Sequence, residues 1–227
     1  MSWILVAALM TGSPEPVSLQ LAEPDAAESL AADLPTGSLI FSKGDCLAVK
    51  VLSASPYTHV GTVVQRGGRH EVYDSTGGTG VRKLSLSAYL ASQGDADLYV
   101  FTPDKPWTRE QRERFERHLE SQLGRPYAIT HHFSGERCEG LHCAEYATDA
   151  LIAGNVLQAR KPPRVSPASL RQGIEQSELY RQRATVHLTP EAPSPPADAG
   201  RCGRWWFSTK ECTRTCYRKL KGWFCCK

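Results

Sequence analysis

Cys143 is the residue of this chain best placed for nucleophilic chemistry. It follows Gly140-Leu-His and opens an amphipathic segment that ends at Gly154. In the first turn of a helix, the dipole and the unpaired N–H groups lower the pKa of a thiol and favour the reactive thiolate. Because buried structural cysteines are common, the side chains expected near Cys143 must decide whether it is a nucleophile.

His59 and Asp74 can supply the other two groups of a cysteine-hydrolase triad. His59 begins an apolar strand, and Asp74 lies near the end of the next strand, which follows Gly67-Gly68. In an antiparallel hairpin centred on these glycines, the two side chains are one diagonal step apart and share a face. A helix opening with Cys143 and packed on this hairpin would place thiolate, imidazole base and orienting carboxylate together.

Apolar periodicity and capping residues predict the elements that position these groups. Strands are expected over 38–42, 46–52, 59–65, 69–75, 97–102 and 184–188, and helices over 25–34, 86–92, 108–123 and 143–153, with a last short helix starting at Ser166. The segment Gly77 to Gly80 is expected to be a flexible loop near the cleft. It lacks the following Lys-Ser/Thr of a phosphate-binding loop.

The charge of the chain is unevenly distributed. Residues 201–227 hold eight Lys or Arg and one Glu, a charge of +7, which leaves −4 on residues 1–200 of a chain whose net charge is +3. An acidic main body does not fit a general nucleic-acid binder. The longest apolar run, Trp3 to Met10, has eight residues and is too short to span a membrane.

Composition predicts four regions: a signal-like segment and N-terminal helix at 1–35, a hydrolase domain at 36–188, a Pro-rich linker at 189–200 and a tail at 201–227. The tail contains five of the eight cysteines, which predicts a disulfide framework and favours the cell envelope or secretion over the cytoplasm. Its interleaved basic and aromatic residues predict binding to an anionic envelope surface. A purely structural disulfide tail and a zinc knuckle are the alternatives, and no specific nucleic-acid partner is expected.

A second group of residues invites a zinc interpretation: His131, His132, Cys138 and His142. Their spacing fits no closed tetrahedral pattern, so neither a metal nor another cofactor is expected. A disulfide between Cys138 and Cys143 that would keep the thiol inactive is a further alternative. Cys46, within an apolar strand, is expected in the core.

Five motifs resemble those of the YiiX-like family of permuted papain-like amidases, allied to the NlpC-type cell-wall hydrolases. They are Gly37 to Phe41, Ser55 to Val64, Val72 to Ser75, Leu123 to Tyr127 and His142 to Tyr146. The resemblance implies an α+β, circularly permuted papain-like fold, with an antiparallel sheet packed against helices and a small Cys-rich C-terminal tail. It also implies Cys143 as nucleophile, His59 as general base, Asp74 as orienting acid and Tyr127 as an oxyanion donor. The chain departs from the family's pattern at Ser38, Ala144 and Asp74, where the family often has Asp, Ser and Glu.

The predicted function is therefore thiol-dependent hydrolysis of an amide bond, with peptidoglycan peptides as the leading substrate. A lipid esterase or acyltransferase with the same triad is the first alternative. The second is a catalytically silent module that binds an envelope ligand.

Overall fold

The computed structural model describes residues 17–22, 29–30, 34–43, 55–94, 96–189, 196, 200–207, 209–210 and 213. The elements in chain order are β1 (Val17–Ala22), β2 (Leu39–Lys43), β3 (His59–Arg66), β4 (Arg69–Thr76), β5 (Gly80–Ser85), α3 (Leu86–Gln93), β6 (Asp97–Pro103), α4 (Arg109–Ser121), α5 (Thr130–Ser134), α6 (Cys143–Ala153), a 3-10 turn η1 (Pro162–Arg164), α7 (Pro167–Gln176) and β7 (Tyr180–Thr189). No helix within these ranges is both long and apolar enough to cross a membrane.

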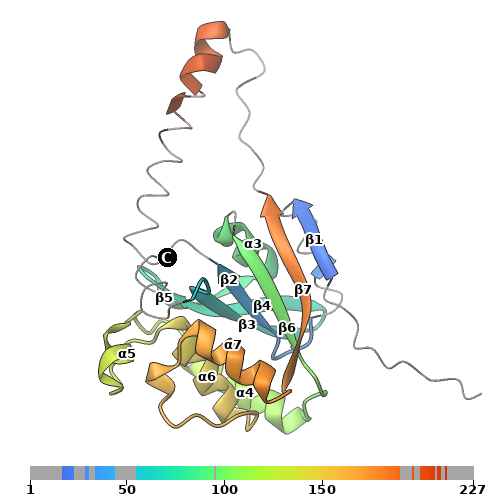
Figure 1. The fold of residues 1–227 in the computed structure, drawn as a ribbon, viewed down its shortest axis with the longest axis vertical. Coiled ribbons are helices and arrows are strands. Elements are labelled where there is room, and N and C mark those ends of the chain that lie inside the picture. The colour runs from blue at the N-terminus through green and yellow to red at the C-terminus, as the bar shows by residue number, and fades with distance from the viewer. Residues whose placement is uncertain are drawn as a thin grey trace, which may run out of the picture.

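One seven-stranded sheet organises the domain, in the order β1-β7-β6-β2-β3-β4-β5 (Figure 1). All neighbours are antiparallel except β1 and β7, which pair in parallel, so the expectation of an antiparallel sheet holds for the strands that carry the site and is wrong at this edge. The edge was missed because a parallel pair joins segments far apart in the chain and leaves no local turn signal.

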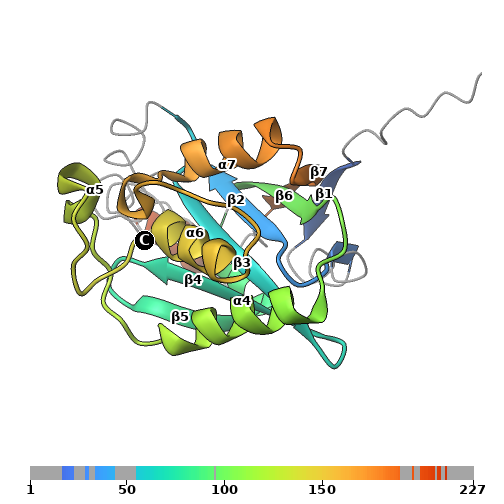
Figure 2. The ribbon, with the colours of Figure 1, turned by 90° about the horizontal axis from the view of Figure 1, so that it is seen from below.

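Helices cover both faces of the sheet. Helices α4, α6 and α7 lie over one face, which Figure 2 shows, and α3 packs on the other. The first face buries a cluster that includes Phe115 of α4, Tyr146 of α6 and Ile174 of α7, and the second buries Tyr89 and Leu90 of α3. Burial of apolar surface stabilises a fold by roughly 25 cal/mol per Å², and this holds the helices on both faces of the sheet.

Caps define where the helices begin, as the sequence predicts. The Thr108 side chain accepts from the backbone N–H of Gln111, while the Gln111 side chain accepts from that of Thr108, which closes a capping box before α4. Ser166 and Ser169 do the same before α7. The bounds of α6 are those expected, Cys143 to Ala153.

Several expectations fall wholly or largely outside the described residues: the signal-like segment with its apolar run at 3–10, most of the helix over 25–34, the strand over 46–52 with Cys46, and the linker at 189–200. From the helix, Leu30 is buried against the α3 side of the sheet, as is Leu34. In the tail, residues 201–207 are helical, and Cys202 there is exposed with a free thiol. The predicted disulfide framework depends on the other four tail cysteines, Cys212, Cys216, Cys225 and Cys226, which also lie outside the described residues.

The segment Gly77 to Gly80, expected as a loop, is a tight turn that joins the paired strands β4 and β5. Gly78 and Gly80 have φ angles of 89° and 73°, which favour glycine. A Cβ on Gly80 would lie 2.2 Å from the backbone oxygen of Arg125, because the chain after α4 packs against the start of β5. This contact fixes β5 beside β4.

We expect Gly80→Ala to destabilise the domain by about 2–4 kcal/mol, because the side chain adds a backbone clash to the strain of a positive φ. Gly78→Ala is the matched control: it has the same sign of φ but no atom within 4 Å of its Cβ position, and should cost about 1–2 kcal/mol. Urea unfolding of both variants measures the difference, and equal losses would show that the Arg125 contact does not restrain β5.

Candidate active site

His59 and Asp74 are joined by the register of the β3–β4 hairpin. Thr62 pairs with Tyr73, which sets Asp74 diagonally from His59 on the same face, as the sequence predicts. The distance from Nε2 of His59 to Oδ2 of Asp74 is 2.9 Å. The Asp74 side chain is completely buried and that of His59 is 13% exposed, so this hydrogen bond is largely shielded from water.

Arg82 of β5 holds the other side of the Asp74 carboxylate. Its Nε donates to Oδ1 at 2.8 Å and its Nη2 donates to Oδ2 at 3.2 Å. Burial alone would raise the pKa of Asp74, but the hydrogen bonds and positive charges of His59 and Arg82 outweigh it and lower the pKa. Asp74 is therefore a stable carboxylate that orients the His59 ring.

The sequence pattern does not predict β5, and so it does not predict that Arg82 lies beside Asp74. Val81 and Leu84 face opposite sides of this strand, so its apolar residues do not alternate with the period of two that reveals a half-buried strand. The signal that could have found it is the glycine-rich turn at 77–80, because a tight hairpin there places residue 82 opposite Asp74.

Cys143 is the first residue of α6, which packs against β3 and β4. Its side chain is buried, and its sulfur lies near the His59 and His142 rings, both of which act on the pKa of the thiol. Burial alone would raise the pKa of the Cys143 thiol, but the positive charge of His59 and the interactions with the two rings lower it from 9.0 to about 6. In turn, burial would lower the pKa of His59, whereas the Cys143 thiolate and Asp74 raise it to about 10.

His142, the second histidine at the sulfur, is committed to the helix cap. Its Nε2 donates to the carbonyl of Pro163 at 2.9 Å, and its Nδ1 accepts from the backbone N–H of Glu145 at 3.3 Å. These partners fix the orientation of the His142 ring, and although burial alone would lower its pKa, the Cys143 thiolate and the Pro163 carbonyl raise it. Because Nε2 of His59 faces Asp74, its Nδ1 is left for the thiol, and His59 rather than His142 fits the role of base.

Tyr127, the candidate oxyanion donor, is half-buried. Burial and the negative charge of the Cys143 thiolate both raise the pKa of its phenol, which therefore stays protonated and remains a hydrogen-bond donor. The loop that carries it is held against α6: Leu141 donates its backbone N–H to the carbonyl of Pro126 at 2.9 Å. Tyr127 is thus close enough to the thiol to be influenced by its charge.

The residues of the alternative zinc interpretation have other partners. The rings of His132 and His142 meet edge to face, with centroids 5.6 Å apart, and the thiol of Cys138 contacts the carbonyl of Gly140 at 3.7 Å. No disulfide connects Cys138 with Cys143. In the described part of the chain, no group of three or more His, Cys, Asp or Glu could hold a metal ion; the His131 side chain lies outside that part.

The fold and the site define a papain-like arrangement in which the strand that begins with His59 precedes the helix that begins with Cys143. The family model described as permuted papain-like amidase enzyme, YaeF/YiiX, C92 family, matches residues 33–161, more than half of the chain. The chain therefore belongs to this family. The matched segment contains His59, Asp74, Arg82, Tyr127 and Cys143.

One solved structure similar to the chain is the crystal structure of the metalloprotein yiiX from Escherichia coli O157:H7. It shares 20% identity with this chain, covers 68% of this chain and 88% of its own, and has a TM-score of 0.47. Among curated proteins, none matches the chain.

We expect the Cys143 thiol to react with a neutral electrophile such as iodoacetamide almost as fast at pH 7 as at pH 9. Because its pKa is lowered to about 6, the thiolate is already formed at neutral pH and is lost only as the pH falls below about 6. In His59→Ala the pKa should return toward 9.0 and the rate at pH 7 should drop about tenfold or more. Alkylation rates from pH 5 to 10, followed by mass spectrometry, measure the pH midpoint of the rate in both proteins. A wild-type midpoint near pH 9 would contradict a thiolate of Cys143 stabilised by the charge of His59.

Proposed function

We propose that the protein is a cysteine hydrolase, an amidase or endopeptidase, with Cys143 as nucleophile, His59 as general base and Asp74 as orienting acid. The observation that carries this proposal is the position of the His59 ring, which is hydrogen-bonded to buried Asp74 and lies close enough to Cys143 for the thiolate charge to raise the pKa of the ring. A nucleophile, a base and a group that orients the base, within hydrogen-bond reach of each other, form the recurring unit of nucleophilic catalysis.

The reaction begins with the Cys143 thiolate attacking the carbonyl carbon of the substrate. The His59 imidazolium then gives its proton to the leaving amine, the C–N bond breaks and an acyl-thioester remains on Cys143. Neutral His59 next takes a proton from a water molecule, whose oxygen attacks the thioester. When this second intermediate breaks down, the acid product leaves and the thiolate–imidazolium pair is restored.

The oxyanion of each tetrahedral intermediate needs hydrogen-bond donors near the sulfur. The start of α6 supplies unpaired backbone N–H groups, and the protonated phenol of Tyr127 adds a side-chain donor. Donors already fixed where the negative charge develops lower the barrier without reorganisation during the reaction.

We propose a peptidoglycan peptide as the substrate, because the family is one of amidases and the tail fits an anionic envelope surface. A lipid ester or acyl group is the alternative substrate for the same thiol chemistry. Purified cell wall and phospholipid vesicles, each incubated with the protein and assayed for released product, separate the two. A protein that reacts with a thiol electrophile no faster than free cysteine would instead fit a silent binding module.

Cys143→Ala should reduce turnover by at least about a thousandfold with the fold intact, because no other group forms the covalent intermediate. His59→Ala should be similarly severe. Asp74→Asn should also be costly but should leave measurable turnover, because it removes the charge that fixes the imidazole tautomer while the nucleophile and the base remain. Hydrolysis of a small amide substrate, with circular dichroism to verify folding, measures the series.

Cys138→Ala is the matched control for this series, because Cys138 is exposed and lies five residues from Cys143. It should retain most of the activity. Full activity of folded Cys143→Ala would refute the mechanism.

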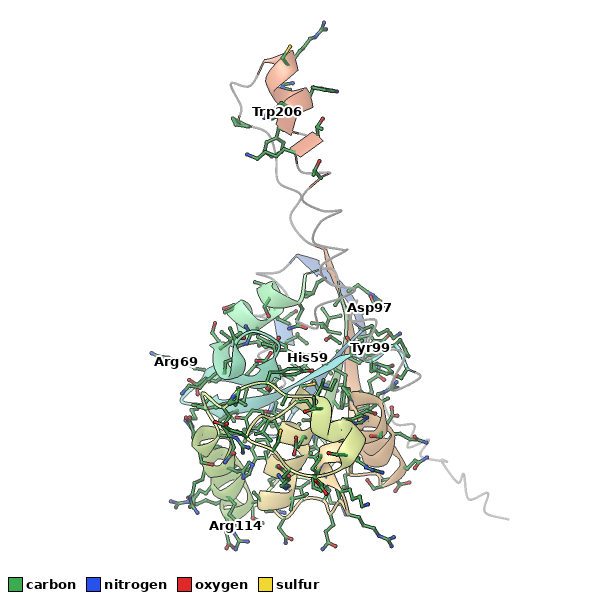
Figure 3. All side chains as sticks on the ribbon, turned by 90° about the vertical axis from the view of Figure 1, so that its left-hand side faces the viewer. His59, Arg69, Asp97, Tyr99, Arg114 and Trp206 are labelled. Carbon is green, nitrogen blue, oxygen red and sulfur yellow. The ribbon has the colours of Figure 1, made fainter. Side chains whose placement is uncertain are left out.

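The tail is proposed to hold the enzyme on an anionic envelope surface. Trp205 and Trp206 are 69% and 65% exposed, and Figure 3 labels the second of them. Arg201 and Arg204 lie on the same helix. Exposed tryptophan beside arginine suits the boundary between water and an anionic polymer or lipid headgroup.

Removal of residues 190–227 should leave hydrolysis of a small soluble substrate nearly unchanged and weaken binding to cell walls or anionic vesicles. Because charge attraction is screened over about 8–10 Å at physiological ionic strength, the binding that is lost should be the salt-sensitive part. Sedimentation with cell walls or vesicles at low and high salt measures it. Equal binding of both forms at low salt would show that the tail has no such role, and unfolding on truncation would show that it packs into the domain.

A further inference from the structure

Two cations lie over the same two aromatic rings at the end of the sheet where β2 ends and β3 begins. The Nζ of Lys43 is 5.6 Å from the ring centroid of Tyr57 and 4.4 Å from that of Tyr99. The Cζ of Arg171, from α7, is 4.5 Å and 5.8 Å from the same two centroids. Two positive charges held on the same pair of rings favour an anion near them.

The side chains of Lys43, Arg171, Tyr57 and Tyr99 offer hydrogen-bond donors to such an anion. Lys43 donates to the Tyr99 hydroxyl and Arg171 donates to the Tyr57 hydroxyl. A phenol oxygen that accepts a hydrogen bond from a cation keeps its own O–H hydrogen as a donor. In addition, the Nε of Arg171 is buried with no hydrogen-bond partner among the described residues. Buried N–H groups are rarely left without an acceptor, which a ligand would supply here.

Two carboxylates lie near this cluster. Glu175, one turn further along α7, accepts from Nη2 of Arg171 at 2.9 Å and forms an ion pair with it. Asp97, whose charge acts on Lys43, lies 2.6 Å from Nδ1 of His187. Among the described residues, Lys43 is thus the cation of the cluster that has no ion pair with a carboxylate.

The cluster adjoins the proposed active site. Ser42, the residue before Lys43, pairs with His59 across β2 and β3, and Tyr57 precedes His59 by two residues. Tyr57 and Cys143 belong to the same buried cluster, on the face that α6 and α7 cover. Figure 3 labels His59 and Tyr99 in the body of the domain. The cluster therefore borders His59 along β2 and along the chain before β3.

We infer that Lys43 and Arg171, on the rings of Tyr57 and Tyr99, form a subsite that binds an anionic oxygen group of the substrate, a carboxylate or a phosphate. This inference rests on the proposed function, because it places the subsite beside the reacting thiol. It narrows the substrate class to amides or esters that carry a negative charge a short distance from the scissile bond.

The test compares alkylation of Cys143 by reagent pairs that differ only in charge. Bromoacetyl-glycine and bromoacetyl-glycylglycine carry a carboxylate at two distances from the reactive carbon, and their carboxamides are the neutral partners. The ratio of carboxylate to carboxamide rate constants should be highest for the wild type at one of the two lengths. Because a hydrogen bond to a charged group contributes about 1.5–3 kcal/mol, Lys43→Gln and Arg171→Gln should each lower that ratio about tenfold.

Arg109→Gln is the matched control, since it removes one positive charge from a side chain that is 87% exposed on α4. Its ratio should equal that of the wild type. An equal ratio in the wild type and in Lys43→Gln at both lengths would overturn the subsite. If Arg171→Gln does not fold, Lys43→Gln decides, because Lys43 ends a strand and Gln removes the charge while it keeps a hydrogen-bond donor on a side chain only one atom shorter. If the carboxamides fail to alkylate Cys143 at neutral pH, the proposed function fails, and the subsite fails with it.

A third reagent distinguishes the two sources of the anion. Bromoacetyl-aminomethylphosphonate has nearly the same length as bromoacetyl-glycine but carries a phosphonate. A faster reaction with the phosphonate, lost in Lys43→Gln, supports the subsite with a phosphate-bearing lipid as substrate. A faster reaction with the carboxylate, lost in the same variant, supports it with a peptide as substrate.

Discussion

The buried carboxylate of Asp74 is the interaction on which both the sheet and the site depend. An unpaired charge in the interior costs several kcal/mol, and removing one partner of a buried pair typically costs about 3–5 kcal/mol. The carboxylate avoids this cost by accepting from His59 of β3 and from Arg82 of β5. A shift of β4 by one residue would turn Asp74 to the opposite face and lose both partners. The catalytic geometry is therefore also a constraint on strand register.

The same carboxylate decides which histidine can act as base. It binds Nε2 of His59 and leaves the other ring nitrogen for the thiol, whereas both nitrogens of His142 are bound to backbone groups. Proximity to Cys143 does not separate the two rings, because both act on the pKa of its thiol. Their hydrogen-bond partners do: His142 is part of the helix cap, which leaves His59 as the ring that fits the proposed base.

What could be predicted from the sequence was the part fixed by local signals. The Gly67-Gly68 turn set the β3–β4 register, and hence the approach of His59 to Asp74, while a helix start and Gly154 bounded α6. Arg82 and β1 were missed for another reason. The apolar residues of β5 do not alternate, and β1 pairs with a strand more than 160 residues away, so neither leaves a short-range pattern. The Lys43 and Arg171 cluster was missed likewise, because only tertiary packing brings α7 to the end of β2.

The proposed anion subsite extends further along the chain than the residues proposed for bond making. The residues proposed for bond making lie between His59 and Cys143, within the segment 33–161 that matches the amidase family. Arg171 lies on α7, beyond that segment, and donates to the Tyr57 hydroxyl. Helix α7 packs against α6 and β7, whereas the Asp74 carboxylate accepts its hydrogen bonds from His59 of β3 and Arg82 of β5. The proposed chemistry therefore depends on strand register within the family segment, whereas the proposed anion subsite depends also on a helix that follows it.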